Sequence, residues 1–135
     1  MKIDKKMKTI LLVEDDPFLI DIYTTKLKET GFNVEVAADG YACLSKIKEK
    51  NEKRGQGKIW PDLVLLDIVL PQIDGWEVLS ALRKDEKLKD IKVIVLSNLG
   101  QREEVEKGNS FKVLKYLIKA HFTPSEVVEE IKKVV

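Results

Sequence analysis

The chain has 135 residues, 44% hydrophobic and 35% charged, a composition typical of one globular domain rather than a disordered or membrane-spanning chain. Its 24 Lys and Arg residues nearly balance 23 Asp and Glu residues, and the net charge of +1 argues against a general attraction to nucleic acid or anionic membranes. The single cysteine, Cys43, excludes an internal disulfide and suits a cytoplasmic location. We interpret residues 1–7 as an N-terminal extension and 8–135 as the domain, because the apolar run behind the basic start is too short for a signal peptide or a membrane span.

Short apolar runs rich in β-branched residues recur along the chain and predict five strands. They are TILLV (9–13), NVEVA (33–37), DLVLLD (62–67), IKVIVLS (91–97) and VLKYLIK (113–119).

Longer segments with helical spacing lie between and after these runs, at 16–31, 40–54, 75–86, 102–108 and 123–135. Asp16 is a candidate cap for the first helix, and Thr123 with Glu126 forms a capping box for the last. The fourth segment, REEVEKG, has the weakest helical signal. The basic stretch 46–58 has no interleaved aromatic residue, so it is interpreted as a solvated helix end rather than a binding patch.

The strict alternation of strands and helices predicts a doubly wound α/β domain. Parallel neighbouring strands need crossover connections, and right-handed crossovers place helices on both faces of a parallel sheet.

Acidic residues cluster where the first and third predicted strands end. Glu14 and Asp15 follow ILLV, and Asp67 follows DLVLL. With the common strand order 2-1-3-4-5, these strands flank the point of order reversal, where ligands bind. Carboxylates held this close share a proton or bind a cation, and hard oxygen ligands suit Mg²⁺, which also favours a phosphate oxygen. The alternative is that the acids only cap the following helix, the role expected of Asp16.

Two further polar groups end the fourth and fifth predicted strands. Ser97 supplies a hydroxyl, and Lys119 supplies an ammonium group behind the run YLI. Together with the carboxylates, they form the set that phosphoryl transfer to an aspartate requires, because cations neutralise phosphoryl oxygens while a hydroxyl donates to another.

The motifs ILLVEDDP, LVLLDIVLPQIDGWEVL, VLSN and YLIKA resemble, in order and spacing, the receiver domain of two-component response regulators of the single-domain, chemotaxis type. The resemblance implies a flavodoxin-like fold and the transfer of a phosphoryl group from a phosphohistidine to Asp67. It further implies that Glu14, Asp15 and Asp67 hold Mg²⁺, that Lys119 and Ser97 are catalytic, that Ser97 and Tyr116 form a switch, and that Pro71 and Gly75 shape the loop after Asp67.

The chain departs from the family pattern at several positions, none of which removes a catalytic group. Ala120 replaces the usual proline, Asn98 the usual small residue, and Lys112 and Val113 the usual Gly-Ala pair, while GQGKIW lengthens the approach to the third strand. A cis bond before a non-proline residue costs about 3–4 kcal/mol, so we expect a trans Lys119–Ala120 peptide with a shifted loop, with a retained cis bond as the alternative.

Three isolated residues have plain interpretations. We expect His121 to be a solvated loop residue and Trp76 and Trp60 to pack against the core rather than to recognise a ligand.

Two other functions stay open. A phosphohydrolase with an aspartyl nucleophile uses the same chemistry, but it usually has a second acid two residues after the nucleophile, where this chain has Val69. A receiver-like module that only binds a partner is less favoured, since the acceptor, acidic pair, hydroxyl and lysine are all present. A nucleotide hydrolase is excluded, because no GxxxxGK followed by Ser or Thr occurs.

The resemblance also implies partners. The phosphodonor is a histidine kinase or a phosphotransfer protein, and a downstream protein binds the surface formed by 102–108, 113–119 and 123–135. We expect Tyr116 to turn inward on phosphorylation and 102–108 to be mobile. A homodimer that forms on phosphorylation is a further expectation. Because these residues leave no room for a DNA-binding segment, output passes through a partner unless the chain is part of a longer protein.

Overall fold

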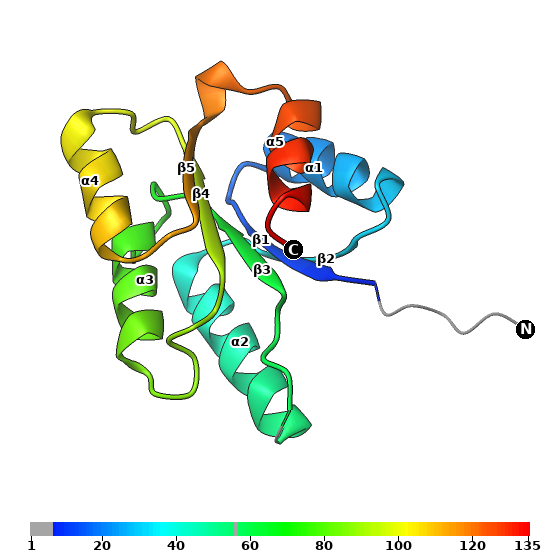
Figure 1. The fold of residues 1–135 in the computed structure, drawn as a ribbon, viewed down its shortest axis with the longest axis vertical. Coiled ribbons are helices and arrows are strands. Elements are labelled where there is room, and N and C mark those ends of the chain that lie inside the picture. Colours follow the sequence, from blue (N-terminus) through cyan, green and yellow to red (C-terminus); the bar gives the residue numbers. More distant parts are fainter. Residues whose placement is uncertain (1–6, 56) are drawn as a thin grey trace, which may run out of the picture.

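The computed structural model describes residues 7–55 and 57–135, in which five strands form one parallel sheet (Figure 1). The strands are β1 (Thr9–Val13), β2 (Asn33–Ala37), β3 (Leu63–Leu66), β4 (Val93–Ser97) and β5 (Lys115–Ile118). All neighbouring pairs are parallel, in the order β2-β1-β3-β4-β5. The predicted sheet and its strand order are therefore confirmed.

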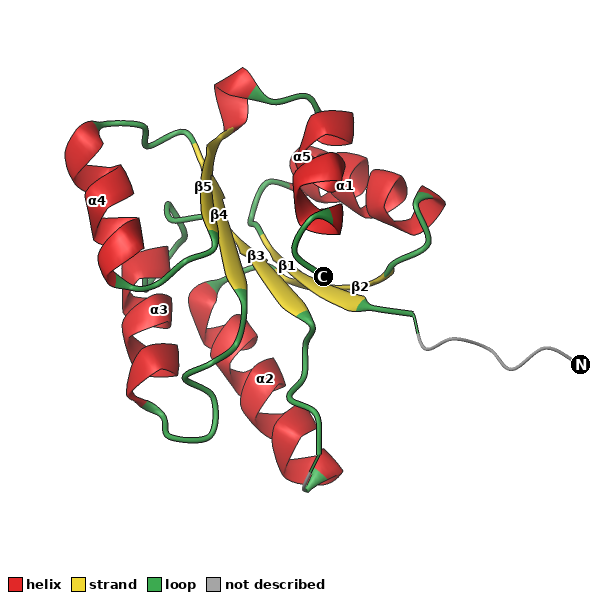
Figure 2. Ribbon diagram, in the orientation of Figure 1, coloured by secondary structure: helices red, strands yellow, loops and turns green. Residues whose placement is uncertain are grey.

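Helices cover both faces of the sheet (Figure 2). They are α1 (Pro17–Glu29), α2 (Gly40–Arg54), α3 (Gly75–Lys84), α4 (Arg102–Ser110) and α5 (Pro124–Lys132), with a short 3₁₀ helix, η1 (Lys119–His121), after β5. In β1, Leu11 and Val13 lie in the core on the α2 and α3 side, whereas Ile10 and Leu12 lie in the core on the α1 and α5 side. This alternation arises because successive strand residues point to opposite faces, so a strand buried on both sides must be apolar throughout.

Three strands are shorter than predicted, and both polar and apolar residues at their ends lie outside the sheet. The predicted strand 91–97 loses its first two residues, and 62–67 and 113–119 shorten at both ends. The Asp62 carboxylate accepts a hydrogen bond from the Thr9 N–H at 2.8 Å, and the Asp67 carboxylate accepts one from the Val69 N–H at 3.3 Å. Lys119 enters η1 instead of extending β5.

The predicted helix starts of α1 and α5 are confirmed. The Asp16 Oδ1 atom accepts a hydrogen bond from the Phe18 N–H at 2.9 Å. Thr123 and Glu126 form a reciprocal capping box, in which each side chain accepts the other residue's backbone N–H at 3.1 and 2.8 Å. Both caps satisfy N–H groups that the first helical turn leaves without partners.

Helix α4 runs two residues further than predicted and explains one departure from the family pattern. Lys112 has a φ of 61°, the left-handed conformation that favours glycine. The Lys112 and Val113 N–H groups donate to the carbonyls of Asn109 and Gly108 at 3.0 and 3.2 Å, the two bonds of a Schellman motif. The position that the family fills with glycine is therefore a left-handed helix end, and here a lysine adopts it.

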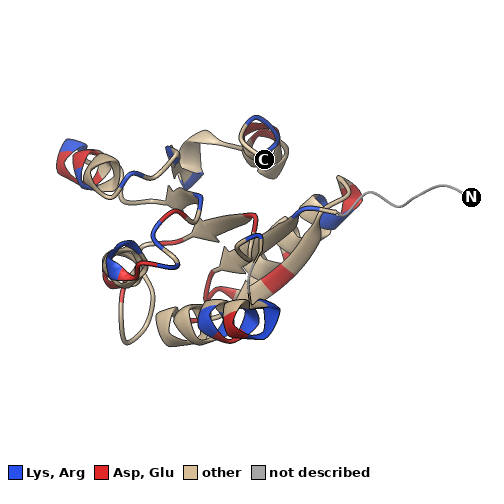
Figure 3. Ribbon diagram, turned by 60° about the horizontal axis from the view of Figure 1, so that its bottom comes forward, with Lys and Arg blue, Asp and Glu red and all other residues tan. Residues whose placement is uncertain are grey.

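Two lysines of the basic stretch 46–58 form ion pairs with the neighbouring strand. Lys46 and Lys50 extend from α2 to Glu35 on β2, with nitrogen–oxygen distances of 3.1 and 3.2 Å. Figure 3 shows acidic and basic residues interleaved along the helices, with a mostly uncharged sheet between them.

Trp60 is buried, as predicted. Its backbone N–H and carbonyl are both hydrogen-bonded by the Asn51 side chain of α2.

The N-terminal extension predicted for residues 1–7 lies, except for Met7, outside the described residues. Within the part of the chain that is described, no helix has the length and apolar character needed to cross a membrane.

Candidate functional site

The three predicted metal-binding acids meet at the carboxyl ends of β1 and β3. A carboxylate oxygen from each of Glu14, Asp15 and Asp67 lies within 4.8 Å of the others. Glu14 and Asp67 are only 3% and 6% exposed, whereas Asp15 is open to solvent. They converge because β1 and β3 pair in register, with Val13 beside Leu66, so the next residues of both strands emerge at one edge of the sheet.

Lys119 crosses from the end of β5 to bridge two of these acids. Its Nζ atom lies 2.7 Å from Glu14 Oε1 and 2.8 Å from Asp67 Oδ2. The only cis peptide among the described residues is Trp60–Pro61, so the Lys119–Ala120 bond is trans, as predicted. Residues 119–121 form η1 at the point where the shifted loop was expected. The lysine therefore reaches the acids from a trans backbone.

Burial and charge shift the pKa values of this cluster. Burial is the largest influence on Glu14 and raises the pKa of its carboxyl, in spite of the hydrogen bond from Lys119, and the nearby Asp67 adds to the increase. Burial alone would lower the pKa of Lys119, but its hydrogen bonds to Asp67 and Glu14 outweigh that effect and raise it. Lys119 is thus held as a cation between two carboxylates.

The donor set fits a hard divalent cation such as Mg²⁺. Three carboxylates present only oxygen ligands, and the exposed Asp15 leaves one side open to the waters that Mg²⁺ retains. Glu14 and Asp67 each have one oxygen bonded to Lys119, while their other oxygens accept only long backbone hydrogen bonds, at 3.2 and 3.3 Å. These weakly held oxygens are the ones suited to a metal.

Ser97 lies at the same edge, at the end of β4. Its side chain is fully buried, and its Oγ accepts a hydrogen bond from the Leu99 N–H at 3.3 Å. Strand β4 pairs with β3, with Val95 beside Leu66, so the strand end that carries Ser97 follows the same edge as Asp67. The following residue, Asn98, is exposed.

Gly75 fixes the loop after Asp67. Its N–H donates to the Ile68 carbonyl at 2.8 Å, which draws the start of α3 against the end of β3. A Cβ atom at this position would lie 2.6 Å from the Asp67 carbonyl oxygen and 2.8 Å from Ile68 Cα, both too close. Because of these two close approaches, only glycine at position 75 permits the loop to close beside Asp67. Within the same loop, Gln72 follows Pro71 and has a φ of 70°.

Tyr116 of β5 is half-buried and contacts the segment after β4 and the start of α3. Its hydroxyl donates to the Leu99 carbonyl at 2.6 Å, and its ring stacks with Trp76 at a centroid distance of 6.3 Å. The turn of Tyr116 on phosphorylation stays a prediction. Leu99 was not singled out from the sequence, since it contacts Tyr116 and Ser97 through its backbone and no side-chain pattern marks it.

The exposure of the remaining isolated residues agrees with the predictions. His121 is exposed, and Trp76 is buried.

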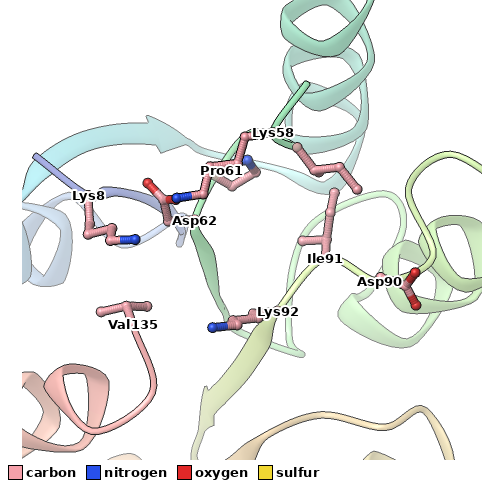
Figure 4. Close-up of a pocket in the computed structure, with 9 residues that line it drawn as sticks. Lys8, Lys58, Pro61, Asp62, Asp90, Ile91, Lys92 and Val135 are labelled. Atoms are coloured by element: carbon pink, nitrogen blue, oxygen red, sulfur yellow. The ribbon is translucent and has the colours of Figure 1, made fainter. Parts of the chain in front are cut away.

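A pocket of about 230 Å³ lies at the opposite, amino-terminal edge of the sheet (Figure 4). Two of its lysines have partners on the protein: Lys58 lies 3.6 Å from Asp62, and Lys92 donates to the Val134 carbonyl at 2.9 Å. The acidic edge, not this pocket, carries the chemistry predicted from the sequence.

Comparisons with known proteins match this arrangement. The sequence model of the family described as "Response regulator receiver domain" matches residues 10–132 of this chain. The chain is 34% identical to the DNA-binding dual master transcriptional regulator RpaA of Synechocystis, over 95% of this chain and 48% of RpaA. It is 35% identical to the probable methanogenesis regulatory protein FilR2 of Methanothrix harundinacea, over 92% of this chain and 81% of FilR2.

Solved structures give the same result. The response regulator TrrA of Thermotoga maritima, solved in complex with Mg²⁺ and beryllofluoride, is 32% identical, with a TM-score of 0.75 over 96% of this chain and all of that one. The chain spans about half the length of RpaA, so it corresponds to one part of that regulator. From the matched model, these identities and the shared fold, the chain belongs to the response regulator receiver family.

Proposed function

We propose that Asp67 accepts a phosphoryl group from a phosphohistidine. The observation that carries this proposal is the Lys119 ammonium, 2.8 Å from Asp67 Oδ2 in a site that excludes most water from the carboxylate. One Asp67 oxygen attacks the phosphorus, and the new O–P bond replaces the P–N bond to the donor imidazole. The imidazole nitrogen keeps the electron pair of the broken bond and takes a proton from solvent.

The surrounding residues would orient and neutralise the group that arrives. Lys119 stands next to the acceptor oxygen, so its positive charge offsets the charge of the phosphoryl oxygens. Ser97 supplies a hydroxyl whose oxygen accepts from the Leu99 N–H and whose hydrogen can be donated to a phosphoryl oxygen. A Mg²⁺ ion held by Glu14, Asp15 and Asp67 would neutralise further phosphoryl charge.

A dedicated phosphohydrolase is less well supported. The residue two positions beyond Asp67 is Val69, which is 60% exposed and carries no group that can activate water. The hypothesis of a module that binds partners without being phosphorylated is also less well supported. It gives no reason for the two buried carboxylates of Glu14 and Asp67 to lie around Lys119 at the ends of three strands.

The partners follow from the family and from the surface. We infer that a histidine kinase or phosphotransfer protein supplies the phosphoryl group and that the chain works in the cytoplasm, where such donors act. The surface of α4, β5 and α5 would bind a downstream protein or a second copy of the chain, rather than nucleic acid. Charges of both signs alternate over these helices, which favours a protein partner over a polyanion (Figure 3).

Intact mass measurement with Mg²⁺ and acetyl phosphate tests the proposal. We expect the mass of one phosphoryl group to be added to the unaltered chain and none to Asp67→Asn. Asp62→Asn is the matched control, because Asp62 lies at the other end of the same strand and should leave labelling unchanged. Full labelling of Asp67→Asn would show that the acceptor is another residue.

A further inference from the structure

The pocket of about 230 Å³ at the amino-terminal edge of the sheet has an apolar wall (Figure 4). The wall combines three segments of the chain: Ile59 and Pro61 precede β3, Ile91 precedes β4, and Val135 follows α5. Pro61 and Ile91 are buried, whereas Ile59 and Val135 are half-buried and present part of their surface to the pocket. This wall can hold a compact apolar group.

Three lysines from separate segments line the same pocket. Lys8 precedes β1, Lys58 lies in the loop before β3, and Lys92 precedes β4 (Figure 4). The sheet fixes the backbone of two of them, because the Lys8 carbonyl accepts the Asn33 N–H and the Lys92 carbonyl accepts the Val64 N–H, both at 2.9 Å. Residues far apart in the sequence are thus brought together at the amino ends of parallel strands.

The two acids of the pocket leave part of this positive charge unbalanced. Asp62 lies 3.6 Å from the Lys58 ammonium, and its other oxygen already accepts the Thr9 N–H at 2.8 Å. Asp90 is exposed and, within residues 7–55 and 57–135, forms no ion pair with a lysine of the pocket. Three ammonium groups therefore face two carboxylates, of which one forms an ion pair.

Lys8 experiences this excess of positive charge most directly. Contact with the Lys58 ammonium is the largest influence on the pKa of Lys8 and lowers it, and the charge of Asp62 opposes this change only in part. Lys92 adds to the repulsion, and its own hydrogen-bond acceptor is the Val134 carbonyl, at 2.9 Å, which carries no net charge. Like charges held this close attract a counter-anion.

We propose that this pocket binds a small organic phosphate, with its apolar body against Ile59, Ile91 and Val135 and its oxygens between Lys8 and Lys58. An organic phosphate carries about two negative charges at neutral pH and several acceptor oxygens, so it can face more than one ammonium group at once. The site lies at the opposite edge of the sheet from the acidic cluster, and it does not depend on the proposed function.

Titration of the full chain with phenylphosphonate, followed by nuclear magnetic resonance without divalent cations, tests the proposal. This probe has a phosphonate group on an apolar ring, and its P–C bond prevents it from phosphorylating Asp67. We expect saturable shifts of the Lys8, Ile91 and Lys92 amide signals, while the Asp67 and Ser97 signals stay in place. No saturable shift near the pocket up to about 10 mM, or shifts at the acidic edge alone, would overturn the proposal.

Two further probes separate the charge of the ligand from its apolar contact. Inorganic phosphate has the charge without the ring, and phenol has the ring without the charge. We expect each to bind at least about tenfold more weakly than phenylphosphonate, because each lacks one of the two contributions. Equal binding of inorganic phosphate would refute the role of the apolar wall, and equal binding of phenol would refute the role of the lysines.

Lysine variants test the residues themselves. Lys8→Gln and Lys58→Gln each remove one positive charge from the pocket and should weaken phenylphosphonate binding at least about fivefold, the effect of one charge at close range in water. Lys48→Gln is the matched control, because Lys48 is exposed on α2, does not line the pocket and changes the net charge equally. The control should change the affinity by less than about twofold, since salt screens distant charges. An equal loss in Lys48→Gln, or full affinity in both pocket variants, would contradict the proposal.

Discussion

Replacing Lys119 with methionine isolates the electrostatics of the acidic site. The lysine side chain is 12% exposed and lies 2.7 and 2.8 Å from carboxylates that are themselves almost fully buried. Methionine keeps most of the apolar length but removes the charge, which leaves Glu14 and Asp67 to repel each other.

The distances set the size of the effect. At an effective dielectric constant of about 20, each contact contributes about 6 kcal/mol of attraction before the cost of removing the charges from water. Breaking a buried ion pair typically destabilises a protein by about 3–5 kcal/mol. Asp15 leaves this site open to solvent on one side. We therefore expect Lys119→Met to lower the free energy of unfolding by about 2–4 kcal/mol without divalent cations.

Magnesium should recover much of this loss. A cation at 100 times its Kd stabilises the state that binds it by about 2.7 kcal/mol. In the variant, Lys119 no longer offsets the negative charge of Glu14 and Asp67, so the stabilising effect of a bound cation should exceed that in the unaltered chain.

Urea unfolding with and without Mg²⁺ measures both effects. Lys46→Met is the control, because Lys46 pairs with Glu35 on the surface at 34% side-chain exposure. Loss of this surface ion pair should lower the free energy of unfolding by about 0–1 kcal/mol, and Mg²⁺ should stabilise this variant no more than it stabilises the unaltered chain. A cost below about 1 kcal/mol for Lys119→Met, or an equal Mg²⁺ effect in both variants, would refute the reasoning.

Three further predictions concern the backbone and the core. Gly75→Ala should destabilise the fold by about 1–3 kcal/mol and reduce labelling by acetyl phosphate, because its Cβ meets the Asp67 carbonyl at 2.6 Å; urea unfolding and intact mass check this. Lys112→Gly should raise the free energy of unfolding by up to about 1 kcal/mol, since glycine accepts the φ of 61° without strain, and an unchanged or lower urea midpoint would contradict this. Cys43 should not react with a thiol reagent at mildly alkaline pH until the chain unfolds, because burial raises its pKa to about 12 and the thiolate is scarce; rapid reaction of the folded protein is the contrary outcome.

Local sequence was sufficient for the fold class. The alternation of apolar runs and helical spacing predicted five strands and five helices, because side-chain periodicity is a property of the backbone geometry of each element. The caps at Asp16 and Thr123 were predictable for the same reason, since a cap satisfies N–H groups only two or three residues away. The acids at the ends of β1 and β3 could be paired because parallel strands bring their carboxyl ends to one edge.

Only the tertiary structure decided how the site is held together. Lys119 and Glu14 are 105 residues apart, and their 2.7 Å contact depends on how η1 departs from β5, which no local pattern specifies. The packing of Tyr116 depends on Trp76 and on the space left by Gly108, on two different helices. Periodicity predicts which face of an element is buried, but not which ring or helix fills the space opposite, because close packing is settled jointly by all the elements that meet there.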